Sequence, residues 1–289
     1  MKILVLGGTR FFGTHLVKAL IKEGHDVTVA TRGNLDFPFK DQVRFEKADR
    51  TKLEDLHRLA TLGPFDMIYD QVCMSAQAAH IACEAFKGKC KRYIFTSTGS
   101  VYNPANGVEL SENLFDQAKY TINLKDTNPY DYQEAKRQAE AVFSQMASFD
   151  VVMVRFPIVL GQDDYTGRLK FHVDAVLNQT PIFFPSLETK MGFIQSHEAG
   201  AFLKFIGEHT CTGAVNAVST GYISLGELMN MIEALTIKKA VFANEANDVN
   251  HSPFGFDKDF MMPNKKGLSF GFKFDLLKGY LPELIKFYI

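Results

Sequence analysis

The sequence predicts an α/β fold, in which a doubly wound parallel sheet carries helices on both faces and a smaller lobe follows toward the C-terminus. Two observations support this prediction. Short apolar runs alternate with amphipathic segments over about the first 160 residues, which is the pattern of β-α-β units. A glycine-rich turn, residues 7–13, stands directly between the first apolar run and the first amphipathic segment.

The elements follow in chain order from this alternation. The first strand is expected at 3–6, and the helix after it, over 11–23, ends before Gly24, a residue type suited to a helix C-cap. A second strand is expected at 26–31. Further buried strands are expected at 65–70, 93–97 and 151–156, with helices over 75–86 and 132–147.

The alternation weakens after Pro157, where Phe, Gly and Pro become more frequent over 163–185 and again over 250–273. We therefore expect two domains. A sheet domain is formed by residues 1–160, with 186–220 returning to it, and a smaller lobe that closes over a bound molecule is formed by 161–185 and 221–289.

Composition narrows the kinds of partner. Lys and Arg number 32 against 33 Asp and Glu, a net charge of -1, which argues against binding to nucleic acid or anionic lipid and favours a small-molecule substrate. The four cysteines show no C-x-x-C pairing, so no metal and no disulfide framework are expected. The N-terminal apolar run is too short for a signal peptide, and no stretch reaches the roughly 18 apolar residues of a membrane helix. A cytoplasmic protein is expected.

The turn Gly7-Gly8-Thr9-Arg10-Phe11-Phe12-Gly13 lies between a predicted strand and a predicted helix. Its glycines permit a tight turn and close backbone approach at the positive end of a helix dipole, which is what a dinucleotide diphosphate needs. The turn therefore predicts a Rossmann domain that binds NAD or NADP. The expected contact residues are Gly7, Thr9, Arg10, Phe11, Phe12 and Gly13. Arg10 stands where such turns often carry a middle glycine; its guanidinium either donates to phosphate oxygens or is solvated.

The end of the second strand bears on the choice of cofactor. A ribose 2′-OH calls for an acidic acceptor there, whereas a 2′-phosphate calls for arginine. The sequence has Thr31-Arg32 and no acid, so NADP is preferred over NAD. The alternative is that Arg32 is only an exposed loop charge.

A second group of residues suggests hydride-transfer chemistry. Tyr132 and Lys136 lie four residues apart, so they share a helix face, and an ammonium near a phenol favours the phenolate. Hydroxyl residues over 96–100 end a predicted buried strand, where they can orient a substrate oxygen. Tyr130 is a rival, but the residue four positions on is Glu134.

Together these residues resemble the short-chain dehydrogenase/reductases, in the extended or atypical branch that includes NAD-dependent epimerase/dehydratases. The segment Ser97-Thr98-Gly99-Ser100-Val101-Tyr102 is similar to the strand-end motif of this branch, and the match runs through most of the chain. The resemblance implies that Thr98 is the catalytic hydroxyl beside Tyr132 and Lys136. It also implies further cofactor contacts, at Asp49, Arg50, Val72, Ser97 and Pro157.

The same resemblance implies an epimerase or dehydratase acting on a nucleotide sugar such as a UDP-sugar, with Thr98 and Ser100 toward the substrate. Arg168, in the smaller lobe, is a candidate for contact with a substrate diphosphate, since nucleotide sugars need cationic partners; the alternative is an ordinary surface charge. A homodimer through helices 75–86 and 132–147 is also implied. Departures leave alternatives open. The turn with Arg10 looks like an atypical subgroup that contains chloroplast RNA-binding relatives, and 70–74 lacks the small apolar residues usual beside the cofactor. An NADPH-dependent reductase of a small carbonyl, or a non-catalytic cofactor-sensing or RNA-binding protein, are the alternatives.

Overall fold

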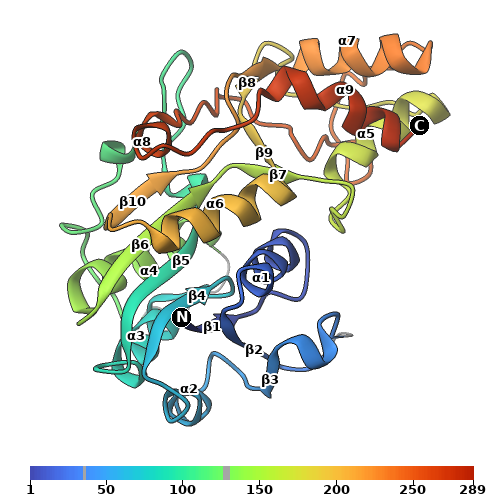
Figure 1. The fold of residues 1–289 in the computed structure, drawn as a ribbon. Helices are drawn as coiled ribbons and strands as arrows, with labels where there is room; N and C mark the ends of the chain where they lie inside the picture. Colours follow the sequence, from blue (N-terminus) through green and yellow to red (C-terminus); the bar gives the residue numbers. More distant parts are fainter. Residues whose placement is uncertain (35–36, 126–130) are drawn as a thin grey trace. The chain divides into compact units, whose positions relative to one another are not determined.

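The computed structural model describes residues 1–34, 37–125 and 131–289, so Tyr130 lies outside the described residues. The chain divides into two compact units. Figure 1 shows the helices and strands of the chain. The sheet unit consists of Met1–Tyr102, Glu112–Phe156 and His197–Ala217. The smaller unit consists of Asn103–Ser111, Pro157–Ser196 and Val218–Ile289.

The sheet unit is built on a seven-stranded sheet with the order β10-β6-β5-β4-β1-β2-β3. All of its pairings are parallel. Its strands are β1 (Lys2–Leu6), β2 (Asp26–Thr31), β3 (Arg44–Lys47), β4 (Phe65–Asp70), β5 (Cys90–Thr98), β6 (Asp150–Phe156) and β10 (Gly213–Asn216). The predicted fold class is thereby confirmed. The order reverses at β1, beside the glycine turn, which is where ligands bind in open α/β sheets.

Helices cover both faces of this sheet, as alternating side chains along the strands require. Leu4 and Ile68 belong to the core under α2, α3 and α4, where the ring of Phe143 packs at a tilt against Tyr93 and Phe95. The opposite face is covered by α1 and α6. The helices of this unit are α1 (Phe12–Lys22), α2 (Leu53–Ala60), α3 (Ala76–Ala85), α4 (Tyr132–Met146) and α6 (Ser196–Glu208), with 3-10 turns η1 (Lys40–Gln42), η2 (Gly99–Val101) and η3 (Glu112–Leu114).

Helices α1 and α6 touch through glycine. A Cβ on Gly200 of α6 would lie 2.9 Å from the carbonyl oxygen of Phe12, and one on Gly207 would lie 2.1 Å from the Tyr69 hydroxyl oxygen. Only glycine allows α6 to lie this close to α1 and to β4. These two glycines therefore allow α6, which follows the 157–196 segment of the smaller unit in the sequence, to pack closely within the sheet unit.

The smaller unit has two short sheets, antiparallel β8 with β11 and parallel β7 with β9, and helices α5, α7 and α9 that pack against one another. Its elements are β7 (Ile158–Leu160), α5 (Arg168–Asn178), β8 (Lys190–Met191), β9 (Phe193–Gln195), β11 (Ile223–Ser224), α7 (Leu225–Thr236), α8 (Lys265–Ser269) and α9 (Leu277–Phe287). Within the described ranges, no helix combines the length and the apolar character that crossing a bilayer requires.

Candidate cofactor and catalytic site

The glycine turn adopts backbone angles that select its residue types. Gly7 and Gly8 have φ of +99° and +86°, values that side chains strongly disfavour. Phe11, the residue before α1, also has a positive φ, of 51°, and its carbonyl accepts a hydrogen bond from the Thr14 hydroxyl at 2.8 Å. The turn is therefore held in a fixed shape at the start of α1.

The space around Gly13 shows whether this turn can accept a diphosphate. A Cβ there would lie 2.9 Å from the Gly8 Cα, and one on Gly7 would lie 3.1 Å from the Val72 side chain. The turn thus keeps its backbone bare where the positive end of α1 begins, and that combination fits a dinucleotide diphosphate. Of the predicted contact residues, Arg10 is exposed and Thr9, Phe11 and Phe12 are partly exposed.

The end of β2 presents Arg32 next to Asp49. Asp49 accepts hydrogen bonds from the Thr51 amide and hydroxyl at 2.9 and 2.7 Å, and these bonds, followed by the charge of Arg32, lower the pKa of the Asp49 carboxyl. Arg32 is exposed and makes no ion pair or hydrogen bond with any described residue. The Thr31 hydroxyl accepts from the Gly33 amide at 3.1 Å and fixes this loop.

Arg50, expected at the cofactor, does not bring its guanidinium to the turn. It is buried and donates to the Asp70 carboxylate from Nε at 2.9 Å and to the Ala78 carbonyl at 2.5 Å. The Tyr93 hydroxyl donates to the same carboxylate at 2.6 Å. The pairing of Arg50 with Asp70 could not be predicted from the sequence, because the two residues lie 20 positions apart.

Lys136 lies in the interior at the ends of β4 and β5. Its ammonium donates to the carbonyls of Cys73 and Thr96 at 2.9 and 3.0 Å and lies 4.8 Å from the centre of the Phe95 ring. Burial lowers the pKa of this lysine. Two of its three protons are bonded to the backbone, so one N–H direction remains for a further acceptor.

Cys73 has its sulfur buried, and burial raises the pKa of its thiol. This placement suits packing rather than nucleophilic chemistry.

The start of α4 is hydrogen-bonded to backbone carbonyls of the segment that follows β5. Gln133, next to Tyr132, donates from Nε2 to the carbonyls of Ser100 and Tyr102 at 2.7 and 2.6 Å. The Thr98 hydroxyl contacts Ser100 at its amide, 3.1 Å, and at its hydroxyl, 3.2 Å. These bonds connect Thr98 and Ser100 to the first turn of α4. The catalytic role of this group stays a prediction. Gln133 itself was missed, because a glutamine on a helix carries no signal of its target.

Arg137 of α4 continues this connection one turn on, since its Nε donates to the Val101 carbonyl at 2.7 Å. Tyr132, the first residue of α4, is 45% exposed.

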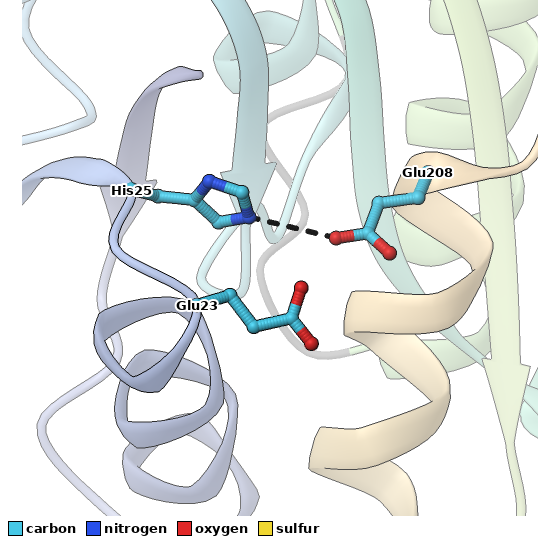
Figure 2. A group of neighbouring side chains, drawn as sticks. All are labelled: Glu23, His25 and Glu208. Carbon is cyan, nitrogen blue, oxygen red and sulfur yellow. Dashed lines mark ion pairs between the residues drawn. The ribbon is translucent and has the colours of Figure 1, made fainter.

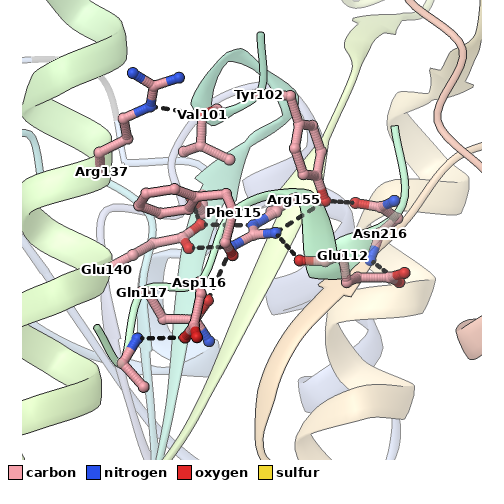
Figure 3. A network of polar contacts seen from close by, with 12 residues as sticks. Val101, Tyr102, Glu112, Phe115, Asp116, Gln117, Arg137, Glu140, Arg155 and Asn216 are labelled. Atoms are coloured by element: carbon pink, nitrogen blue, oxygen red, sulfur yellow. Dashed lines mark hydrogen bonds and ion pairs between the residues drawn. The ribbon is translucent and has the colours of Figure 1, made fainter. Parts of the chain in front are cut away.

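Ser97 points away from this surface. Its hydroxyl donates to Glu140 at 2.5 Å, and Glu140 in turn pairs with Arg155 inside the protein (Figure 3). Arg155 also donates to the Tyr102 hydroxyl at 2.9 Å and the Glu112 carbonyl at 3.0 Å. The network ties β5, α4 and β6 together beneath the strand ends, so the Ser97 side chain is part of the support of the site.

Two predicted residues lie in the smaller unit. Pro157 is buried directly before β7, and Arg168 is the first residue of α5, where its carbonyl accepts a hydrogen bond from His172. Their roles toward cofactor and substrate stay predictions.

One group of possible metal-ligand atoms occurs within the described ranges, formed by Glu23, His25 and Glu208 (Figure 2). Lys204 pairs with both carboxylates, at 3.1 Å to Glu208, and its ammonium supplies the positive charge between them. The lysine thus already fills the role of a cation, and the group connects α6 to the end of α1.

The sequence of this chain matches one family model and parts of two curated proteins. The family model described as the NAD dependent epimerase/dehydratase family matches residues 3–181. Two curated relatives match over shorter segments. Chloroplast stem-loop binding protein of 41 kDa b from Arabidopsis thaliana is 34% identical over 114 residues, 35% of this chain and 30% of the relative. The 2′-dehydrokanamycin reductase of Streptomyces kanamyceticus is 29% identical over 112 residues, 39% of this chain and 32% of the relative.

Solved structures match over the full length. A UDP-glucose 4-epimerase from Thermotoga maritima, solved with UDP-glucose, has a TM-score of 0.76 and 19% identity and covers 100% of this chain and 98% of its own. The Thermus thermophilus UDP-glucose 4-epimerase with NAD has a TM-score of 0.77 and 15% identity, covering 100% and 99%. A Bacillus cereus UDP-glucuronic acid 4-epimerase has a TM-score of 0.77 and 19% identity, covering 100% and 99%. At these identities the likeness establishes the fold.

Proposed function

Because the chain belongs to the NAD dependent epimerase/dehydratase family, we propose that it is an enzyme that oxidises and reduces a sugar carbon of a nucleotide sugar, such as a UDP-sugar. The observation that carries this proposal is the arrangement at the strand ends of the sheet unit. Gln133 hydrogen-bonds the turn that bears Ser100 to the start of α4, the helix whose first residue is Tyr132, and the Thr98 hydroxyl accepts from the Ser100 amide in the same turn. A protein that only binds a cofactor has no chemical need for this set.

Each residue has a distinct role in the proposed reaction. Thr98, with Ser100, orients the reacting substrate oxygen. Tyr132 takes the proton from a substrate hydroxyl, or gives one to a carbonyl, and Lys136 favours the phenolate electrostatically. The nicotinamide cofactor, when bound, supplies or accepts the hydride. Lys136 is held by two backbone carbonyls, so its charge is fixed in place.

The cofactor is proposed to be NADP rather than NAD. Arg32 is an exposed cation at the end of β2, and no carboxylate stands at Thr31 or Arg32 to accept from a ribose 2′-OH. Solved relatives named above include one in complex with NAD, which makes the comparison of the two cofactors the sharpest single measurement.

A second candidate function is NADPH-dependent reduction of a small carbonyl compound. The absence of an acid at residues 31 and 32 favours it, and a relative matching part of the chain is named a reductase. The two candidates differ in whether the cofactor is regenerated within one turnover or consumed.

The experiment begins with the nucleotide that copurifies. Protein denatured after purification releases any tightly held dinucleotide, which mass spectrometry identifies. Wild type and Tyr132→Phe are then assayed with UDP-glucose and UDP-glucuronic acid, by product analysis and by the absorbance of reduced nicotinamide. Sugar conversion without net NADPH loss, lost in Tyr132→Phe, supports the first candidate. NADPH consumption with a small carbonyl substrate supports the second, and full activity of Tyr132→Phe refutes the proposed chemistry.

The assembly is proposed to be a homodimer through α3 and α4, which pack side by side in the sheet unit. Light scattering of the purified protein gives its mass directly. A monomeric mass at assay concentrations contradicts this part of the proposal.

A further inference from the structure

One buried ion pair is bonded to both sides of the segment that connects β4 to α3, residues 71–75. Arg50 and Asp70 form this pair, in which the guanidinium donates to the carboxylate oxygen Oδ2 from Nε at 2.9 Å and from Nη2. The other carboxylate oxygen, Oδ1, accepts from the Val72 amide at 3.2 Å. Nη1 of the guanidinium donates to the carbonyl of Ala78, in the first turn of α3, at 2.5 Å. The pair therefore joins the end of β4, the segment and the start of α3.

The middle of this segment supplies a hydrogen-bond acceptor to Lys136. The carbonyls of Cys73 and Thr96 both accept from its ammonium. Thr96 lies within β5 and is fixed by strand pairing, whereas Cys73 lies outside any helix or strand. The bond from the Val72 amide to the ion pair is made by the residue directly before Cys73. The place of this second acceptor therefore depends on the ion pair.

The charges of the pair act on Lys136 in opposite directions. Burial lowers the pKa of Lys136, the Asp70 carboxylate raises it, and the Arg50 guanidinium lowers it again. Cys73 and Glu140 are the other titratable groups that act on this ammonium, and both raise its pKa. Since the two charges of the pair oppose each other, the contribution that remains is the placement of the Cys73 carbonyl.

We propose that Arg50 and Asp70 are positioning residues for Lys136, because together they fix the segment whose Cys73 carbonyl holds the ammonium. This rests on the proposed function, since it affects catalysis only if Lys136 favours the phenolate of Tyr132. When the segment is released, the ammonium keeps one fixed backbone acceptor, Thr96. Its charge is then less firmly placed, and Tyr132 keeps its proton to higher pH.

The test uses two variants of the pair and one control in the same network. Arg50→Lys keeps the positive charge but offers one nitrogen in place of three, so it cannot bond the carboxylate and Ala78 as arginine does. Asp70→Asn, the second variant, keeps the size and removes the carboxylate charge. Tyr93→Phe is the matched control, because the Tyr93 hydroxyl donates to the same carboxylate at 2.6 Å but contacts neither Val72 nor Ala78 through it. Circular dichroism establishes that each variant is folded.

Two measurements separate the placement of the segment from its effect on the reaction. Hydrogen exchange, followed by mass spectrometry of peptides covering 71–75, reports how firmly the segment is held. We expect exchange at least about tenfold faster in Arg50→Lys and Asp70→Asn, and wild-type exchange in Tyr93→Phe.

The second measurement is the pH profile of kcat, per folded enzyme, with the substrate that the wild type converts. We expect the limb that reports Tyr132 to move up by about one pH unit in Arg50→Lys and Asp70→Asn, and to stay in place in Tyr93→Phe. The limb moves upward for oxidation and for reduction alike, because both depend on the same proton of Tyr132.

Wild-type exchange of the segment in Arg50→Lys overturns the inference and leaves the proposed function intact. Faster exchange with an unshifted limb overturns it as well, because the pair then supports only the fold. An equal shift in Tyr93→Phe also contradicts it, since any disturbance of the network would suffice. If the wild type converts neither a nucleotide sugar nor a small carbonyl compound, the proposed function fails and the inference fails with it.

Discussion

Glu140 and Arg155 form a fully buried ion pair, with 2.6 Å between Glu140 Oε2 and Arg155 Nη2 and 3.0 Å between Oε1 and Nε. Both side chains are 0% exposed. Removing such a pair from water costs free energy, so the pair adds little net stability, and its main effect is to hold the neighbouring elements in a defined position. Ser97 at the end of β5 joins the same carboxylate, one residue before Thr98. The ion pair therefore supports the strand end that carries the proposed catalytic hydroxyl.

Removing one partner of this pair should destabilise the protein strongly. Glu140→Ala leaves the Arg155 charge buried without a carboxylate, and we expect a loss of about 3–5 kcal/mol in the free energy of unfolding. Urea unfolding measures it. Lys119→Ala is the control in the same unit, because Lys119 pairs with Asp116 at 3.0 Å at an exposed position, and it should cost no more than about 1 kcal/mol. Equal effects of the two substitutions would contradict this account.

Gln133→Leu should reduce activity by acting on position. The substitution removes both hydrogen bonds to the Ser100 and Tyr102 carbonyls, so the turn with Ser100 is less firmly held to the start of α4. We expect kcat with the sugar substrate to fall about tenfold to a hundredfold, with the Kd for the cofactor unchanged. Steady-state kinetics and titration together separate the two. The same kcat for the wild type and Gln133→Leu would show that the two Gln133 hydrogen bonds do not contribute to catalysis.

Gly13→Ala should disrupt the cofactor turn through contact with backbone. Its Cβ would lie 2.9 Å from the Gly8 Cα, and backbone cannot move aside as a side chain can. We expect an overpacking cost of about 1–3 kcal/mol and a cofactor Kd raised more than about tenfold. Gly24→Ala is the control, since Gly24 has a φ of +73° but nothing within 4 Å of a new Cβ. It should cost about 1–2 kcal/mol through its left-handed backbone and leave the Kd unchanged. Unaltered cofactor affinity in Gly13→Ala would show that the cofactor does not approach the backbone of the turn at Gly13.

The sequence predicted the framework of the sheet unit because local signals mark it. The strands expected at 3–6 and 26–31 correspond to β1 (Lys2–Leu6) and β2 (Asp26–Thr31), bounded by glycine and by the change from apolar to polar residues. The helix expected over 132–147 is α4, which begins at Tyr132 as predicted. Periodicity and capping are local properties, so a single sequence contains them.

The support of the site could not be predicted in the same way. Ser97 was expected at the cofactor, but its hydroxyl is bonded to Glu140, 43 positions away. Arg50 was expected there too, and its guanidinium is bonded to Asp70. A polar residue at a strand end can turn toward a ligand or toward the interior, and the choice depends on partners that only the fold brings near.

Arg32→Ala should change cofactor preference. If Arg32 binds the 2′-phosphate, its removal costs a charge-assisted contact, and the Kd for NADP⁺ should rise about tenfold to a hundredfold while that for NAD⁺ changes little. Titration with both cofactors measures the ratio. Arg44→Ala is the control, because Arg44 on β3 is also exposed but pairs with Glu46 at 2.8 Å. Comparable affinity for both cofactors in the wild type, unaffected by Arg32→Ala, would exclude the assigned preference.

His172 should make the smaller unit lose stability in mild acid. Its ring is buried between Phe184 and Phe254, with Nε2 2.7 Å from the Ser252 hydroxyl, and burial lowers the pKa of His172 from 6.5 to about 4. Below pH 6.5 the unfolded chain takes up a proton at this ring that the folded protein refuses until about pH 4. The stabilisation is therefore complete above pH 6.5 and is lost as the pH falls toward 4, by about 3 kcal/mol in all.

His172→Phe removes this titration, so the wild type should lose about 3 kcal/mol more than the variant between pH 7 and pH 4 in urea unfolding. His251→Gln, at an exposed ring of the same unit, should follow the wild-type curve. The substitution itself costs the hydrogen bonds of the imidazole, which lowers stability at every pH and leaves the slope as the diagnostic quantity. Parallel pH profiles for wild type and His172→Phe would mean that the ring is protonated in the folded protein as readily as in the unfolded chain.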